Sequence, residues 1–367
     1  MHVPFCARRC TYCDFAIAVR REVPVAEYAD GLRRELEARS LGGQTLETLY
    51  LGGGTPSKLG GTGVAHVIDA VRERFTIADG AEVTIEANPE DVTADAARAW
   101  RASGVNRLSL GAQSFAPNVL EWMHRTHTAD DIARAVHTAR DEGIGDLSLD
   151  LIFALPDALE RDWQRDVDAA IALEPNHLSV YGLTVEPHAA LGHRAARGET
   201  ADAPEERWAA EFVAANAALT SAGYSHYEVS NYAREGHRAR HNEAYWLGNA
   251  YLGVGPSAHG YDLDSRRWNE AAYAHWVSRV AKGEDPVAGS ERLTAEQRMA
   301  EAVYLGLRTD RGLALEPRDT SVVQSWVGAG WAAVLERHGS RTLQLTPAGW
   351  MRLDSLAASL TAFRSRY

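Results

Sequence analysis

The chain has 367 residues, of which 45% are hydrophobic and 24% charged, a composition typical of an ordinary globular protein. This length favours one large domain plus a smaller one. The formal net charge of −12 argues against a nucleic-acid partner, because such partners are bound through basic surfaces. No apolar run reaches the roughly 20 residues that a transmembrane helix needs, and the N-terminus lacks the apolar core of a signal peptide, so we expect a cytoplasmic protein.

Helical and strand-like patterns alternate through the first half of the sequence. Apolar residues at helical spacing predict helices near residues 28–36, 64–71, 93–103, 128–142 and 163–171. Strand-like segments fall between them, at residues 2–3, 48–51, 82–86, 107–110, 147–153 and 178–183. Repeated βα units predict a parallel sheet of six strands, closed or partly closed as a barrel, with function at the carboxyl ends of the strands.

The alternation of predicted helices and strands becomes less regular after residue 185. One helix is predicted to end near residue 222, aromatic-rich strand and turn segments follow to about 262, and short helices with two small strands begin near 290. The last part resembles a compact winged-helix-like α+β module. We therefore predict a barrel over residues 1–222, with its first strand largely missing at the N-terminus, a linking region over 223–289 and a C-terminal domain over 290–367.

Cys6, Cys10 and Cys13 are the three cysteines of the chain. Their odd number and tight spacing exclude a disulfide framework, and soft thiolates on one short loop favour zinc or an iron–sulfur centre. Zinc would need a fourth ligand, with His237 or His241 as candidates, whereas a [4Fe-4S] cluster on three cysteines leaves one iron open. The spacing favours the cluster; zinc and an inert triplet remain as alternatives.

The cysteine motif, with an aromatic residue before its last cysteine, resembles the signature of the radical S-adenosylmethionine (SAM) superfamily. The residues that flank this motif narrow the resemblance to the family related to anaerobic coproporphyrinogen III oxidase. They are His2-Val3-Pro4-Phe5 and Asp14-Phe15. The resemblance implies an α/β fold with a partial (β/α)6 barrel of TIM type, and a [4Fe-4S] cluster on the three cysteines. It also implies that SAM binds the open iron, where an electron from the cluster cleaves it to a 5′-deoxyadenosyl radical.

The resemblance assigns further residues to the SAM site. Those that match family positions are Tyr12, Gly53, Gly54, Thr55, Glu86, Gln113, Arg125 and Asp150. The glycines belong to a Gly-Gly-Gly-Thr-Pro loop that meets the amino group of SAM in the family, and a missing Cβ lets the backbone approach a ligand. Carboxylates suit ribose hydroxyls, and an amide both donates and accepts. Family members usually have glycine where Ala154 stands, so the backbone is less free there.

Two features separate the branches of this family. Coproporphyrinogen dehydrogenases carry a further cysteine where this chain has Phe15, together with a long N-terminal extension. The sequence motif HNxxYW is typical of the haem chaperone (HemW) branch, where it is associated with haem. In this chain it is formed by His241, Asn242, Tyr245 and Trp246. An imidazole can ligate haem iron, and the two aromatic rings can form a wall for the macrocycle.

The sequence therefore predicts a haem chaperone-like protein that binds a [4Fe-4S] cluster, SAM and haem. The resemblance implies two protein partners, a haem acceptor and an electron donor, neither of which the sequence identifies. The first alternative is an oxygen-independent coproporphyrinogen III dehydrogenase that removes hydrogen from propionate side chains. The second is a zinc-stabilised binding module without redox chemistry.

Overall fold

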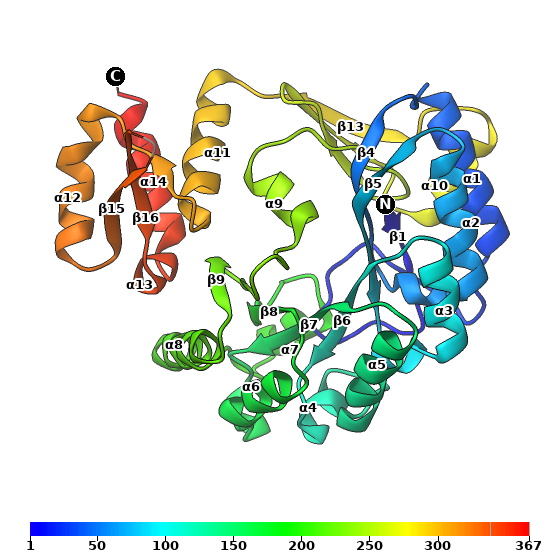
Figure 1. The fold of residues 1–367 in the computed structure, drawn as a ribbon, viewed down its shortest axis with the longest axis horizontal. Helices are drawn as coiled ribbons and strands as arrows, with labels where there is room; N and C mark the ends of the chain where they lie inside the picture. The colour runs from blue at the N-terminus through cyan, green and yellow to red at the C-terminus, as the bar shows by residue number, and fades with distance from the viewer. Residues whose placement is uncertain (338, 367) are drawn as a thin grey trace.

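The structure is a computed structural model that describes residues 1–337 and 339–366. An eight-stranded sheet forms its centre, in the order β1-β4-β5-β6-β7-β8-β10-β9 (Figure 1). The strands of this sheet are β1 (His2–Val3), β4 (Thr45–Gly53), β5 (Thr76–Ala87), β6 (Arg107–Gln113), β7 (Asp146–Phe153), β8 (His177–Gly182), β9 (Ser225–Glu228) and β10 (Asn231–Ala233). The six strands from β1 to β8 in this order are parallel, as the alternating pattern predicts, and β10 and β9 are antiparallel additions.

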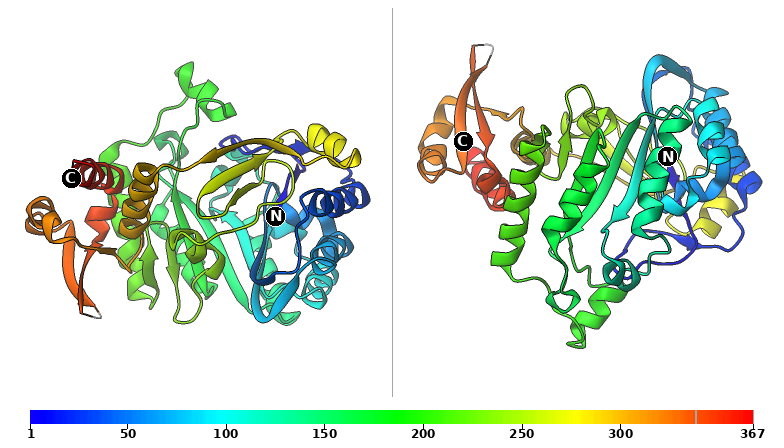
Figure 2. Two further views of the ribbon diagram at one scale, coloured as in Figure 1. Left: turned by 90° about the horizontal axis from the view of Figure 1, so that it is seen from above. Right: turned by 60° about the horizontal axis from the view of Figure 1, so that its bottom comes forward.

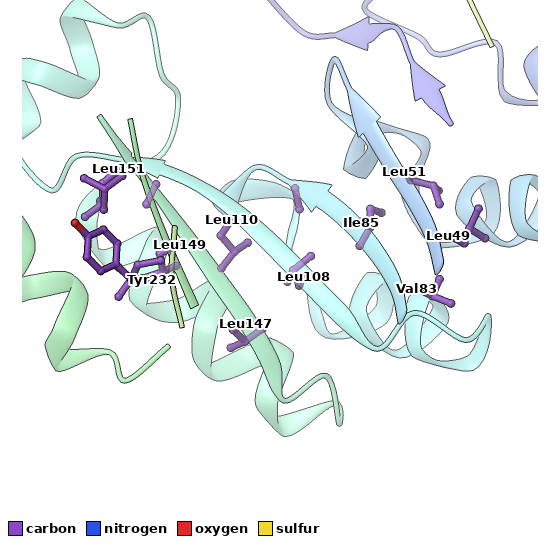
Figure 3. Packing of buried hydrophobic residues seen from close by; sticks show 14 of the residues in the cluster. Leu49, Leu51, Val83, Ile85, Leu108, Leu110, Leu147, Leu149, Leu151 and Tyr232 are labelled. Carbon is purple, nitrogen blue, oxygen red and sulfur yellow. The ribbon is translucent and has the colours of Figure 1, made fainter. Parts of the chain in front are cut away.

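Helices cover the outer face of the parallel strands, as the views in Figure 2 show. They are α1 (Val25–Ala38), α2 (Gly60–Arg72), α3 (Ala94–Ala102), α5 (Ala129–Asp141), α6 (Trp163–Ala172) and α8 (Glu205–Ser221). Alternate strand residues point toward these helices, because successive side chains of a strand face opposite sides. Leu51, Ile85, Leu108 and Leu149 are fully buried there (Figure 3). The remaining alternate residues face the interior of the barrel.

Shorter elements surround this barrel, and all but the first of them lie in the second half of the chain. They are α4 (Pro117–Trp122), α7 (Ala190–Ala196), α9 (Arg240–Trp246), α10 (Tyr273–Ala281) and an antiparallel sheet of β11 (His259–Tyr261), β12 (Ser265–Asn269) and β13 (Val287–Arg292). The prediction had only strands and turns around α9, because a helix of seven residues is too short for a clear periodic signal. β9 and β10 lie beyond residue 222 and nevertheless extend the main sheet.

A buried carboxylate attaches the segment after residue 250 to α1. Glu35 is fully buried and accepts hydrogen bonds from Arg39 (2.7 Å), Asn269 Nδ2 (2.7 Å) and Trp276 Nε1 (2.9 Å). The backbone N–H of Gly255 donates to it as well, at 2.8 Å. A buried charge persists only when it is paired and hydrogen-bonded, so this network fixes the position of residues 253–276 against the barrel.

The C-terminal module is the compact α+β unit that the sequence predicts. It contains α11 (Ala295–Arg308), α12 (Thr320–Gly328), α13 (Pro347–Trp350), α14 (Leu353–Arg364) and a sheet of β14 (Leu313–Ala314), β16 (Ser340–Leu345) and β15 (Ala332–Arg337), in that order. In Figure 1 α11 lies beside the small sheet and the other helices of the module. Trp350 attaches it to the main sheet, because its ring meets that of His226 of β9 edge-on, with the centroids 4.3 Å apart. Within the module, Trp350 Nε1 donates to Leu307 O of α11 at 3.0 Å.

Ala154, just after β7, has a positive φ of 56°. This left-handed conformation costs an L-residue about 1–2 kcal/mol, and glycine avoids that cost. The resemblance predicts glycine at this position for the same reason. The alanine is held there by the chain around it, since its N–H donates to Glu211 Oε2 at 2.7 Å.

We predict that Ala154→Gly stabilises the protein by about 0.5–1 kcal/mol, after the greater unfolded-state entropy of glycine is subtracted. The measurement is the melting temperature, with Ala112→Gly as the control. Ala112 is also fully buried, but it lies within β6 and has no positive φ. The control should lose about 1 kcal/mol. Equal destabilisation of both variants would show that Ala154 is not strained.

Candidate cofactor site

The cysteine loop is tied to the barrel at both ends. β2 (Phe5–Cys6) pairs in parallel with β3 (Ala18–Val19), so the segments on both sides of the loop are hydrogen-bonded to each other. Its tip is held by Thr11, whose Oγ1 donates to Trp122 O at 3.3 Å and whose carbonyl accepts from Leu191 N at 2.8 Å. These contacts fix the loop at the carboxyl ends of the parallel strands, where the barrel prediction places function.

Cys6, Cys10 and Cys13 line one cavity of about 530 Å³, which we call the cysteine cavity. The three thiols are half-buried and free of disulfides. Burial raises the pKa of Cys6 and Cys13 above the ordinary value of a thiol. The loop therefore does not stabilise thiolates by itself, whereas a bound metal centre deprotonates its thiol ligands. Three thiols on the lining of one cavity fit a cluster that leaves one iron open.

The structure brings all the residues predicted for SAM to this same cavity. Its lining includes Tyr12, Gly53, Gly54, Thr55, Glu86, Gln113, Arg125 and Asp150. Two of them contact the thiols: Thr55 Oγ1 lies 3.3 Å from Cys6 Sγ, and Arg125 Nη1 lies 3.7 Å from Cys10 Sγ. Residues that are far apart in the sequence thus surround one space beside the cysteines.

The glycine loop at the end of β4 has a role in packing that the sequence did not reveal. Gly53 has a φ of +112°, and a Cβ there would lie 2.2 Å from the His2 ring. A Cβ on Gly54 would lie 2.8 Å from the backbone of Pro4. We expected these glycines to leave room for a ligand, but the room is filled by the segment that leads into Cys6. Larger residues here would displace the cysteine loop as well as any ligand.

The two carboxylates are held in different ways. Glu86 accepts from Tyr50 OH at 2.8 Å and from Gly53 N at 3.0 Å, and burial raises its pKa to about 7. Asp150 accepts from Ser109 Oγ at 3.2 Å, and burial raises its pKa to about 6. The N-terminal ammonium acts on Glu86, and Arg107 and Arg125 act on Asp150, but burial has the larger effect on both carboxylates. A positively charged ligand beside them would therefore favour their ionised forms.

Arg125 and Gln113 line the same cavity and both approach Gly111. Arg125 Nη2 donates to Asn88 Oδ1 at 2.7 Å and to Gly111 O at 2.8 Å. Gln113 is in the left-handed region, with φ of 66°. A strained non-glycine residue at the end of a strand is common at ligand sites, where the surrounding structure holds it in place. This outlier supports the prediction that Gln113 belongs to the site.

The inner face of the barrel adds polar residues that the sequence analysis missed. They are Asn88, Arg107, Ser109, Ser148, His177, Ser179 and Tyr181, and they line the same cavity. Their signal was present, because polar residues recur at every second position of β6, β7 and β8 opposite the buried leucines. That alternation normally indicates a strand with one face in water. Here the polar face lines the barrel interior.

The HNxxYW residues lie on α9 and divide between two cavities. Asn242 lines the cysteine cavity, whereas His241, Tyr245 and Trp246 line a second cavity of about 800 Å³. We call it the histidine cavity, because His2, His241 and His259 line it. The two cavities share Tyr50, Gly53 and Glu86.

The zinc alternative finds no support in the arrangement. His241 lies on the histidine cavity. His237 lies 3.3 Å from Asp146 Oδ1, at the start of β7. Neither histidine lines the cysteine cavity, so neither is placed to be the fourth ligand of a metal on the cysteine loop.

Comparison with known proteins agrees with this geometry. The model of the radical SAM superfamily matches residues 1–170. The solved structure of coproporphyrinogen III oxidase (HemN) from Escherichia coli, described as a radical SAM enzyme, has a TM-score of 0.82 at 21% identity, covering 99% of this chain and 89% of that chain. Fold and site together define a radical SAM protein.

Relatives that match most of the chain identify its family within the radical SAM proteins. The chain is 39% identical over 365 residues to "Heme chaperone HemW" of Mycobacterium tuberculosis, covering 98% of this chain and 93% of that protein. It is 32% identical to the protein of the same name from Bacillus subtilis, covering 86% and 84%. The chain belongs to the HemW family. Across residues 1–337 and 339–366, none of the helices combines the length and apolar character that crossing a bilayer requires.

Proposed function

We propose that this protein binds haem and delivers it to an acceptor protein, and that it holds a [4Fe-4S] cluster and SAM in the same chain. The observation that carries this proposal is the pair of adjoining cavities, one lined by the three thiols and the other by the HNxxYW residues. The name of its relatives, "Heme chaperone HemW", supports haem as the cargo.

In this proposal Cys6, Cys10 and Cys13 hold the cluster, and the cysteine cavity holds SAM beside it. When both are bound, the cluster supplies the electron for reductive cleavage of SAM. The residues of the chain bind and orient: Arg125 and Gln113 line this cavity, and Glu86 and Asp150 offer carboxylates that a cationic ligand favours in their ionised form. An electron donor is required as a partner.

We propose the histidine cavity as the haem site. Tyr245 and Trp246 would lie against the macrocycle, because aromatic rings provide large apolar surface. Asn242 faces the cysteine cavity, which makes α9 a wall between cargo and cofactor. That His241 ligates the iron stays a prediction. The reduced thiols that a cluster requires suit the cytoplasm, where disulfides are rare.

The second candidate is coproporphyrinogen III dehydrogenation, which the shared fold with the Escherichia coli oxidase favours. Against it stands Phe15, whose 62% exposed side chain occupies the position of the additional cysteine in such enzymes.

We predict haem binding at about one per chain and no product from coproporphyrinogen III with SAM and a reductant under anaerobic conditions. Chromatography of the porphyrins measures this, and oxidative decarboxylation would establish the alternative.

A further inference from the structure

Three imidazoles line the histidine cavity, and they differ in whether they can bind iron. His241 has both ring nitrogens in hydrogen bonds: Nδ1 lies 2.8 Å from Thr48 Oγ1, and Nε2 lies 2.8 Å from Tyr245 OH. Its ring also stacks on Tyr50 at 5.0 Å between ring centroids. An iron bond to His241 would have to replace one of these contacts. In this structure His241 holds α9 against β4.

His2 is also held by contacts within the protein. Its ring packs against Gly53, and the backbone of Pro256 lies nearby. Nδ1 is buried, without a partner among the described residues, and is therefore closed to a ligand in the cavity. Burial lowers the pKa of His2 to about 4. His2 is thus part of the wall below the cavity.

His259 is different from both. It is exposed, and within residues 1–337 and 339–366 neither ring nitrogen has a hydrogen-bond partner. Its position is nevertheless fixed, because β11 pairs with β12 and sets His259 opposite Trp268. The two rings lie nearly parallel, with centroids 6.1 Å apart. This gives the cavity an available imidazole on a rigid strand rather than on a loop.

The rest of the cavity suits a flat, dicarboxylic macrocycle. Trp246 and Tyr251 provide aromatic surface, and Arg266 and Arg298 place two guanidinium groups on the same lining. Arg266 forms an ion pair with Glu301 at 2.8 Å, and Arg298 one with Asp264 at 3.5 Å. Both arginines are about two-fifths exposed (38% and 43%), so propionate groups can reach them, and Arg recognises carboxylates in a forked geometry.

We propose that His259 supplies the axial ligand of haem iron in the histidine cavity, while His241 positions α9. This inference rests on the proposed function, because it assumes that haem is the cargo. It assigns different consequences to the two histidines. Loss of His259 removes a bond to the iron, and loss of His241 removes hydrogen bonds between α9 and β4.

The test is a titration of each reconstituted variant with ferric haem, followed by absorbance and electron paramagnetic resonance. His259→Ala should weaken haem binding by about tenfold or more and lose the histidine-ligated spectrum, with an unchanged melting temperature. His259→Tyr should bind haem with a tyrosinate-type spectrum, since tyrosine also ligates haem iron. His241→Ala should keep the wild-type spectrum and melt at a lower temperature. His66→Ala is the control, because His66 is exposed on α2, outside both cavities.

A His259→Ala variant with the wild-type spectrum and affinity would overturn the assignment. If His241→Ala instead lost the histidine-ligated spectrum, the iron ligand would be His241, as the sequence predicts. Failure of the proposed function looks different, because the wild-type protein itself would then bind no stoichiometric haem. The two failures are therefore distinguishable in a single set of titrations.

Discussion

Replacing Cys6, Cys10 or Cys13 by serine is expected to abolish the cluster completely. The chain has three cysteines, so a variant has no other thiol to take the vacant position. Serine is a poor substitute, because soft thiolates are the ligands that iron–sulfur centres select. Iron and acid-labile sulfide, measured after anaerobic reconstitution, should fall from about four of each per chain to near zero, together with loss of the visible absorbance.

The control for these variants is Ala16→Ser. Ala16 belongs to the same loop but does not line the cysteine cavity, so this substitution should retain the full iron and sulfide content. A cysteine variant that keeps a complete cluster would mean that the thiol in question is not a ligand. Retention by all three variants would remove the cysteine loop as the site.

Asp150→Ala is expected to weaken SAM binding without loss of the cluster. Asp150 lies inside the barrel on β7 and accepts hydrogen bonds from Ser109, at a distance along the sequence from every cysteine. A hydrogen bond to a charged group contributes about 1.5–3 kcal/mol, so SAM affinity should fall by roughly tenfold to a hundredfold. Because burial raises the pKa of Asp150 to about 6, removing this disfavoured charge should cost little folding stability.

Calorimetric titration of the reconstituted protein with SAM measures this effect under anaerobic conditions. Asp168→Asn is the matched control, since Asp168 lies on the exposed side of α6, where it accepts from Gln164 at 2.8 Å. That variant also loses a carboxylate, yet it should bind SAM normally. Unchanged affinity in Asp150→Ala would place SAM away from β7.

Much of the barrel could be predicted because its helices and strands differ clearly in the spacing of their apolar residues. The predicted strands at 147–153 and 178–183 agree with β7 and β8 to within a residue, since apolar residues recur at every second position through most of both segments. The cysteine motif and the predicted SAM residues also converge on one cavity. These residues were recognisable because they match positions of the family, and Gly53 and Gln113 stand at the carboxyl ends of β4 and β6, where parallel strands place function.

What could not be predicted depends on contacts between distant parts of the chain. The hydrogen bond between His241 and Thr48 spans 193 positions, and no local pattern indicates it. A histidine beside two aromatic residues therefore looked like a free ligand in the sequence. His259, by contrast, occurs in a glycine-rich stretch without a helical or strand signal, and only the pairing of β11 with β12 shows where it lies.

The most direct test of the whole account is the iron, acid-labile sulfide and haem content of one sample of wild-type protein, reconstituted anaerobically and then supplied with haem. We predict about four non-haem irons, about four sulfides and about one haem per chain, bound at the same time. Simultaneous occupancy is expected because the cluster and haem belong to two adjoining cavities with different linings. Stoichiometric zinc without visible absorbance, or a complete cluster in a protein that takes up no haem, would contradict the account.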